Sequence, residues 1–191
     1  MGIRYNDESH LRTWKDEGKF PRIHDDIFTL FMQTFEAESV IDLCCAIGIL
    51  GTRIHEKAGV EVCGVELLEK NITRAQKWGV PIPIRQLSIE RATLVSFTDI
   101  IRERGATGIV ARRCISELFG NTPDNRVDWE WANLWTEAVA DAGVTEIWIE
   151  GRADQGRSVH PIPDTATEVK CLSSRFSVEE THRNCAYLRT T

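Results

Sequence analysis

The sequence lacks the features that mark membrane and exported proteins. It holds no run of about 18 apolar residues, the length that a membrane-spanning helix needs. Its first ten residues, MGIRYNDESH, contain no apolar core of the kind that a secretory signal requires. We therefore predict a cytoplasmic protein with no membrane partner.

Signatures of metal sites and disulfide scaffolds are also missing. None of the 6 cysteines forms a CxxC pair, and the 5 histidines show neither HxH nor HExxH spacing. Several cysteines stand inside apolar runs, as Cys63 and Cys114 do, so we expect reduced and mostly buried thiols and no metal. The formal net charge of −6 argues against bulk attraction to nucleic acid and leaves only a local basic patch for such binding.

The length and composition fit a single globular domain. Of the 191 residues, 42% are hydrophobic and 27% are charged, which supports a full core. Residues 1–21 are mostly polar and irregular, and we predict that they form an N-terminal arm or lid. Residues 22–191 make up the predicted domain.

From residue 22 onward, helical periodicity alternates with short apolar runs. The amphipathic helix predicted over 22–35 comes first, and the predicted strands that follow, separated by helices, cover 40–45, 60–67, 83–88, 108–112 and 146–150. Residues 151–167 predict a long loop, and the runs 176–181 and 185–189 predict a hairpin. This order indicates an α/β fold: a doubly wound, mostly parallel seven-stranded sheet with an antiparallel C-terminal hairpin and helices on both faces.

In an open α/β sheet, ligands bind beyond the carboxyl ends of the strands, so the first strand-to-helix turn is the place to search. This turn reads DLCCAIGILG and begins with Asp42. Small residues follow at alternate positions, namely Cys44, Ala46 and Gly48, and small residues let a ligand approach the backbone closely. The second strand ends on another acid, Glu66, 24 residues after Asp42.

The turn resembles motif I of the class I S-adenosylmethionine-dependent methyltransferases, whose usual form is D-x-G-x-G-x-G. Asp42 matches the acid of this motif, Cys44 and Ala46 replace its first two glycines, and Gly48 matches the third. The resemblance implies a methyltransferase that uses S-adenosylmethionine as cofactor. It also implies that these residues, together with Cys45, bind the cofactor.

The same resemblance assigns further residues to the cofactor. Glu66 corresponds to the acid that holds both ribose hydroxyls, a role for which a carboxylate is suited because it accepts two O–H donors. Leu67 stands where an apolar side chain covers the adenine, and Ser88, with Glu90 as an alternative, stands near the adenine amino group. Arg112 at the end of the fourth strand is expected to hold the cofactor carboxylate.

Other interpretations of these residues remain open. A nicotinamide-binding domain would need glycines at 44, 46 and 49, where the chain has Cys, Ala and Ile. Both acids also suit helix N-caps. On the methyltransferase fold itself, the chain is alternatively a non-catalytic cofactor-binding or interaction protein, or an enzyme that uses the cofactor for cleavage or aminopropyl transfer.

The acceptor side is marked by arginines. Arg113 follows the fourth strand and Arg152 the fifth, with Arg157 and His160 in the loop beyond. Because a guanidinium binds carboxylate and phosphate in a bidentate manner, we expect an anionic acceptor, either a nucleic-acid loop or a phosphorylated or carboxylated small molecule. His160 is a candidate base. If Arg112 and Arg113 both lie on the strand, one side chain faces each side of the sheet. The alternatives are a salt bridge from the paired arginines to Glu117 or a helix acid, a solvated His160, and a structural rather than nucleophilic role for Cys114.

Overall fold

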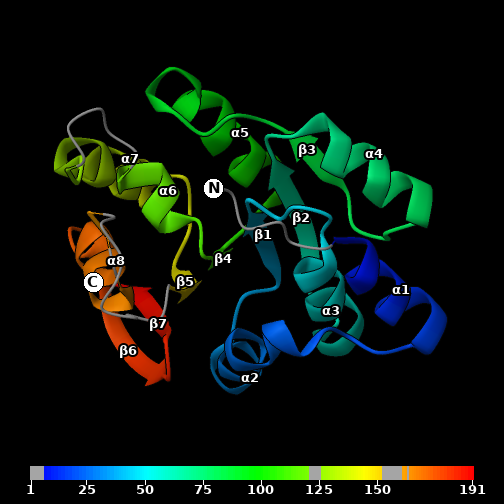
Figure 1. Ribbon diagram of the computed structural model, residues 1–191. Helices are drawn as coiled ribbons and strands as arrows, with labels where there is room; N and C mark the ends of the chain where they lie inside the picture. The colour runs from blue at the N-terminus through cyan, green and yellow to red at the C-terminus, as the bar shows by residue number, and fades with distance from the viewer. Residues whose placement is uncertain (1–6, 121–125, 152–160, 163) are drawn as a thin grey trace.

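A computed structural model describes residues 7–120, 126–151, 161–162 and 164–191. Within these residues, seven strands form one sheet in the order β3-β2-β1-β4-β5-β7-β6 (Figure 1). Neighbouring strands from β3 to β5 run parallel, and β7 pairs antiparallel with both β5 and β6. The predicted fold class is confirmed. The strands are β1 (Ser39–Leu43), β2 (Glu61–Glu66), β3 (Ile84–Gln86), β4 (Gly108–Arg112), β5 (Glu146–Glu150), β6 (Phe176–His182) and β7 (Cys185–Thr190).

Helices cover both faces of the sheet (Figure 1). On one face, α2 and α3 bury their apolar side chains against β1, β2, β4 and β5, and on the other α5, α7 and α8 do so. The described helices are α1 (Asp7–Glu17), η1 (Arg22–His24), α2 (Asp25–Thr34), α3 (Ile49–Ala58), α4 (Glu69–Trp78), η2 (Arg91–Thr93), α5 (Leu94–Arg104), α6 (Ile115–Gly120), α7 (Trp129–Asp141) and α8 (Thr165–Leu172).

The N-terminal segment differs from its prediction. We expected residues 1–21 to be irregular, but Asp7–Glu17 form α1, and the buried Leu11 packs with Ile47 and Ile49. The segment is therefore held on the turn after β1 by an apolar contact. The helix predicted over 22–35 is also divided, into η1 and α2.

Two short helices escaped the sequence analysis. α6 follows β4 after a two-residue connection, and α8 begins inside the stretch that we predicted as loop. The start of α8 is set by Asp164, whose carboxylate accepts a hydrogen bond from the Thr167 N–H at 2.8 Å. Asp128 caps the start of α7 in the same way, since the Trp131 N–H donates to Asp128 Oδ1 at 2.9 Å.

A buried carboxylate ties the amino end of β5 to the rest of the sheet. Glu146 Oε2 accepts from the N–H groups of Ala37, at 2.8 Å, and Glu36, at 3.2 Å, just before β1. Its Oε1 accepts from the Tyr187 hydroxyl of β7 at 2.7 Å. Burial and the neighbouring Glu146 raise the pKa of Tyr187, so this hydroxyl stays a donor at neutral pH.

Glu146→Ala should lower the free energy of unfolding by about 3 kcal/mol or more, because three donors lose their acceptor and a buried unsatisfied group costs roughly 1–3 kcal/mol. Tyr187→Phe, which removes only the hydroxyl, should lower it by about 1 kcal/mol. Urea denaturation of both variants measures the difference. Equal losses would mean that the backbone bonds of Glu146 contribute nothing.

Candidate functional site

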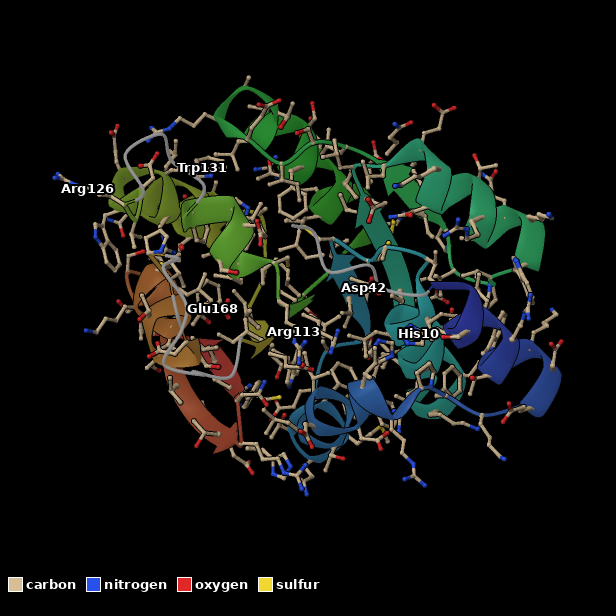
Figure 2. All side chains as sticks on the ribbon, viewed as in Figure 1. His10, Asp42, Arg113, Arg126, Trp131 and Glu168 are labelled. Carbon is tan, nitrogen blue, oxygen red and sulfur yellow. The ribbon has the colours of Figure 1, made fainter. Side chains whose placement is uncertain are left out.

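A cavity of about 420 Å³ opens at the carboxyl ends of β1, β2 and β4. In Figure 2, Asp42 from β1, His10 from α1 and Arg113 from the end of β4 are labelled near the centre of the molecule. Predicted site residues from the turn after β1, the end of β2 and the end of β4 share this one cavity. Its lining comprises His10, Ile23, His24, Asp42, Leu43, Cys44, Cys45, Ala46, Ile47, Ile49, Leu50, Glu66, Leu68, Asn71, Arg112, Arg113, Cys114 and Glu117.

The turn between β1 and α3 has an unusual backbone. Cys44 and Ala46 have positive φ values, 54° and 52°, and so does Gly48, at 73°. All three positions of the motif glycines are thus left-handed, although two of them carry side chains. A left-handed conformation costs an L-residue roughly 1–2 kcal/mol, which glycine avoids. The chain therefore keeps the backbone shape that the motif requires without keeping its glycines.

Two buried carboxylates hold this turn in place. Asp42 Oδ2 accepts from the Gly51 N–H at 2.9 Å. Glu66 Oε2 accepts from the Ala46 N–H at 2.8 Å, and its Oε1 accepts from the Leu68 N–H at 2.7 Å. Glu66 lines the cavity but is only 6% exposed, so it braces the loops as well as facing the cavity.

Burial makes the ionised form of the Asp42 carboxyl group unfavourable. Burial raises its pKa to about 7, and the neighbouring carboxylate of Glu66 adds to this increase, while the hydrogen bond from the Gly51 N–H opposes it. A substantial fraction of Asp42 is therefore protonated at neutral pH.

The two consecutive arginines converge on one acid. Arg112 Nε donates to Glu150 Oε2 at 3.0 Å, and Arg113 Nε donates to Glu150 Oε1 at 3.1 Å. We expected strand residues facing opposite sides, but Arg113 lies beyond β4 with a φ of 55°. Burial raises the pKa of Glu150, and the two guanidinium groups oppose that increase. The acid that pairs with both arginines is thus Glu150 of β5. We had considered Glu117 or an acid on a helix.

Sequence analysis missed the histidines of the cavity. His24 is 8% exposed, and its Nδ1 has no hydrogen-bond partner within the part of the chain that the structure describes. Burial lowers its pKa, and the charges of Arg112, His10 and Arg53 lower it further, so the imidazole is neutral at pH 7. Its ring centroid lies 6.3 Å from that of His10. No motif contains these residues, and only the packing of α1 and η1 on the turn brings them there.

Three predicted cofactor residues do not line the cavity. A Cβ at Gly48 would come within 3.2–3.3 Å of side chains from Val80, Ile82 and Ile84, so this glycine faces the packed side of the turn. Leu67 is 55% exposed, and neither it nor Ser88 lines the cavity. The alternative residue, Glu90, forms a capping box at the start of η2.

The remaining predicted residues divide into two groups. Arg152, Arg157 and His160 lie outside the described residues. Cys114 is buried, and its thiol donates to the Leu43 carbonyl oxygen at 3.5 Å. The hydrogen bond with Cys44 and burial raise the pKa of Cys114 well above its usual range, which disfavours a nucleophilic thiolate there.

The left-handed turn gives a direct prediction. Ala46→Gly should raise the free energy of unfolding by about 0.5–1 kcal/mol, because relief of the strain exceeds the entropy that glycine adds to the unfolded chain. Ala140→Gly within α7 is the control and should lower it by about 0.5–1 kcal/mol. Chemical denaturation measures both, and a loss of stability in Ala46→Gly would contradict the strain argument.

The raised pKa of Asp42 predicts how stability depends on pH. Because the folded state binds the proton more tightly than the unfolded state, the stability that this group contributes is present below about pH 4 and decreases as pH rises toward 7. Asp42→Asn keeps an acceptor for the Gly51 N–H and removes the charge. It should be more stable than the unmodified chain at pH 8, by on the order of 3 kcal/mol, with the difference vanishing near pH 4. A stability difference between the two chains that did not change with pH would contradict the explanation by the raised pKa of Asp42.

Comparison with known proteins supports the fold and adds no relative at the level of sequence. No protein-family model matches the chain, and no curated protein sequence matches it. Solved structures do match in fold, and eight of them share 11–15% sequence identity with this chain.

Three of these structures illustrate the likeness. The bifunctional kinase-methyltransferase WbdD superposes with a TM-score of 0.63 and 12% identity, over 94% of this chain and 42% of WbdD. DesVI of Streptomyces venezuelae gives 0.51 and 15%, over 83% and 61%. A structure that concerns the conversion of a disulfide bond into a thioacetal group during echinomycin biosynthesis gives 0.60 and 13%, over 86% and 80%. This chain spans about two fifths of the WbdD chain. Its strand order and these likenesses identify the fold as that of class I methyltransferases.

Proposed function

We propose that the chain is an S-adenosylmethionine-dependent methyltransferase and that the cavity at the ends of β1, β2 and β4 binds the cofactor. The observation that carries this proposal is the joint placement of Asp42, Glu66 and the left-handed turn around that cavity. A methyltransferase fold alone does not require such a turn to remain intact. The left-handed backbone, which is retained although two glycines are replaced, supports a cofactor site.

Glu66 is the proposed ribose ligand. Its two oxygens already accept from the N–H groups of Ala46 and Leu68. A carboxylate offers about four lone-pair positions, so each oxygen keeps one for a ribose hydroxyl. The two backbone bonds fix the carboxylate in advance, which reduces the entropy lost on binding.

The proposed division of the cavity follows the strands. The turn after β1 and the end of β2 hold the nucleoside, and the end of β4, with Arg112, faces the methionine part. When bound, S-adenosylmethionine supplies an electrophilic methyl group for an in-line displacement. The residues of this chain then act by aligning the two reactants, an effect worth several orders of magnitude in rate.

The acceptor is proposed to be anionic. Arg112 and Arg113 both pair with the Glu150 carboxylate, and each planar guanidinium has five N–H donors in a geometry that suits carboxylate and phosphate groups. Arg113 is the more accessible of the two arginines, with its side chain 37% exposed, and it lines the cavity. A nucleic-acid loop and a phosphorylated or carboxylated small molecule both match this charge, and Arg152 and His160 remain proposed contacts from the sequence.

The cellular location stays a prediction. Among the described helices, none combines the length and apolar character that crossing a bilayer demands. A cytoplasmic location is the proposal that we retain.

The cofactor proposal predicts micromolar binding of S-adenosylhomocysteine in calorimetry. Glu66→Gln should weaken this binding by about 10- to 100-fold, because a hydrogen bond to a charged group contributes roughly 1.5–3 kcal/mol. Glu61→Gln, at the exposed opposite end of β2, is the matched control and should bind normally. Thermal melts of both variants identify any loss that comes from folding alone.

Three outcomes separate the candidate functions. Absence of heat and of any thermal shift at millimolar S-adenosylhomocysteine would overturn the cofactor proposal. Binding without transfer of a radiolabelled methyl group to any acceptor class would favour the non-catalytic alternative, which the two replaced glycines support. Transfer to an acidic small molecule or to RNA would identify the acceptor class.

A further inference from the structure

Two cysteines stand side by side in the wall of the cavity. Cys44 is the first residue of the turn after β1. Cys114 is the second residue after β4, the strand that pairs with β1 in the sheet. Both side chains line the cavity, and the Cys44 thiol is close enough to contribute to the raised pKa of Cys114. The Cys114 thiol also reaches the Leu43 carbonyl oxygen, one peptide unit from Cys44.

The two thiols differ in access. Cys44 is exposed, whereas Cys114 is buried beneath it. Burial and the hydrogen bond with Cys44 keep the pKa of Cys114 high, so Cys114 retains its proton. Cys45 is turned away from this pair: a Cβ on Gly64 of β2 would come within 2.5 Å of the Cys45 sulfur, so this thiol lies against β2.

We propose that Cys44 and Cys114 form a reversible disulfide under peroxide and that this bond closes the cavity to the nucleoside cofactor. The second half of this inference rests on the proposed function, and the first half does not. The exposed sulfur meets the oxidant, and the buried sulfur lies within reach of it.

The chemistry balances in two steps with hydrogen peroxide as the oxidant. The Cys44 thiolate attacks one peroxide oxygen, the O–O bond breaks, and Cys44 becomes a sulfenic acid while hydroxide leaves and takes up a proton to form water. The Cys114 thiol then attacks the Cys44 sulfur, and its proton passes to the sulfenic oxygen, which leaves as a second water while the S–S bond forms. Two thiol protons and two electrons are lost in all, and a dithiol reductant restores both thiols.

The new bond would change the shape of the cavity. Sulfur atoms in a disulfide are about 2.05 Å apart, closer than two unbonded thiol sulfurs, so we expect the bond to draw the turn toward β4. This movement narrows the gap between the turn after β1 and the end of β4. The same turn carries the Ala46 N–H that positions Glu66, so the ribose ligand is disturbed as well.

The test begins with peroxide treatment of the reduced chain, alkylation of the remaining thiols and tryptic mass spectrometry. We expect two of the 6 thiols to resist alkylation and a cross-link between peptides 23–53 and 114–126. Because peptide 23–53 holds both Cys44 and Cys45, two variants assign the bond: Cys44→Ser should abolish the cross-link, and Cys45→Ser should retain it. Far-UV circular dichroism checks that both variants fold.

Calorimetry of the oxidised and reduced chains with S-adenosylhomocysteine tests the consequence. Oxidation should weaken binding at least tenfold, and dithiothreitol should restore it. Absence of the cross-link, or its survival in Cys44→Ser, overturns the inference, as does equal affinity before and after oxidation. If the reduced chain fails to bind S-adenosylhomocysteine, the proposed function fails, and the mass spectrum alone decides whether the disulfide forms.

Discussion

The turn after β1 is the constraint on which the rest of the site depends. Five residues connect a buried strand to a buried helix, and the backbone achieves this only by entering the left-handed region at Cys44, Ala46 and Gly48. The conformation of this turn needs support from other contacts, because the positive φ angles strain Cys44 and Ala46, which carry side chains. The carboxylates of Asp42 and Glu66 offset that strain through backbone N–H groups. Residues of this turn and of the end of β4 line the same cavity.

Electrostatics at the site is governed by burial more than by formal charge. Burial raises the pKa of Asp42 to about 7 and lowers the pKa of His24, so both groups carry less charge than their exposed counterparts would. Glu150 is also buried, but it faces two guanidinium groups. A carboxylate in that position costs less than an isolated one, and removing it would leave two cations facing each other. The charges of Glu150, Arg112 and Arg113 thus compensate one another within the fold.

The sequence predicts the sheet well because each strand and its helix carry a local signal. Gly59 and Gly79 end helices in left-handed conformations, and Asp128 caps α7, all as their residue types indicate. α1 gave no such signal, since only Leu11 is fully buried in a polar segment and its partners lie about 36 residues further along the chain. α8 was hidden because its Asp cap stands in a stretch rich in proline and turn residues.

The site was predictable only in part for a related reason. Asp42 and Glu66 were found because the ends of parallel strands meet at one edge, a rule that needs no tertiary detail. His10 and His24 come from α1 and η1, which lie outside the alternating strands and helices of the sheet. No sequence spacing relative to the strands therefore predicts that they line the cavity. Gly48 lies in the predicted turn, but a Cβ there would face Val80, Ile82 and Ile84, and a motif identifies backbone positions and not the direction in which a side chain would project.

The motif is usually written with glycines, but in this chain its three positions share a positive φ angle rather than a residue type. Cys44 and Ala46 meet that requirement with side chains present, which explains how the fold persists at 12% identity to a solved methyltransferase while no family model matches the chain. The replacement is not chemically neutral, however. A glycine at position 44 offers only backbone to the cavity, whereas a cysteine there adds an exposed thiol beside the buried thiol of Cys114. The left-handed cysteine at this position therefore places an exposed thiol in the wall of the cavity, where a glycine would place none.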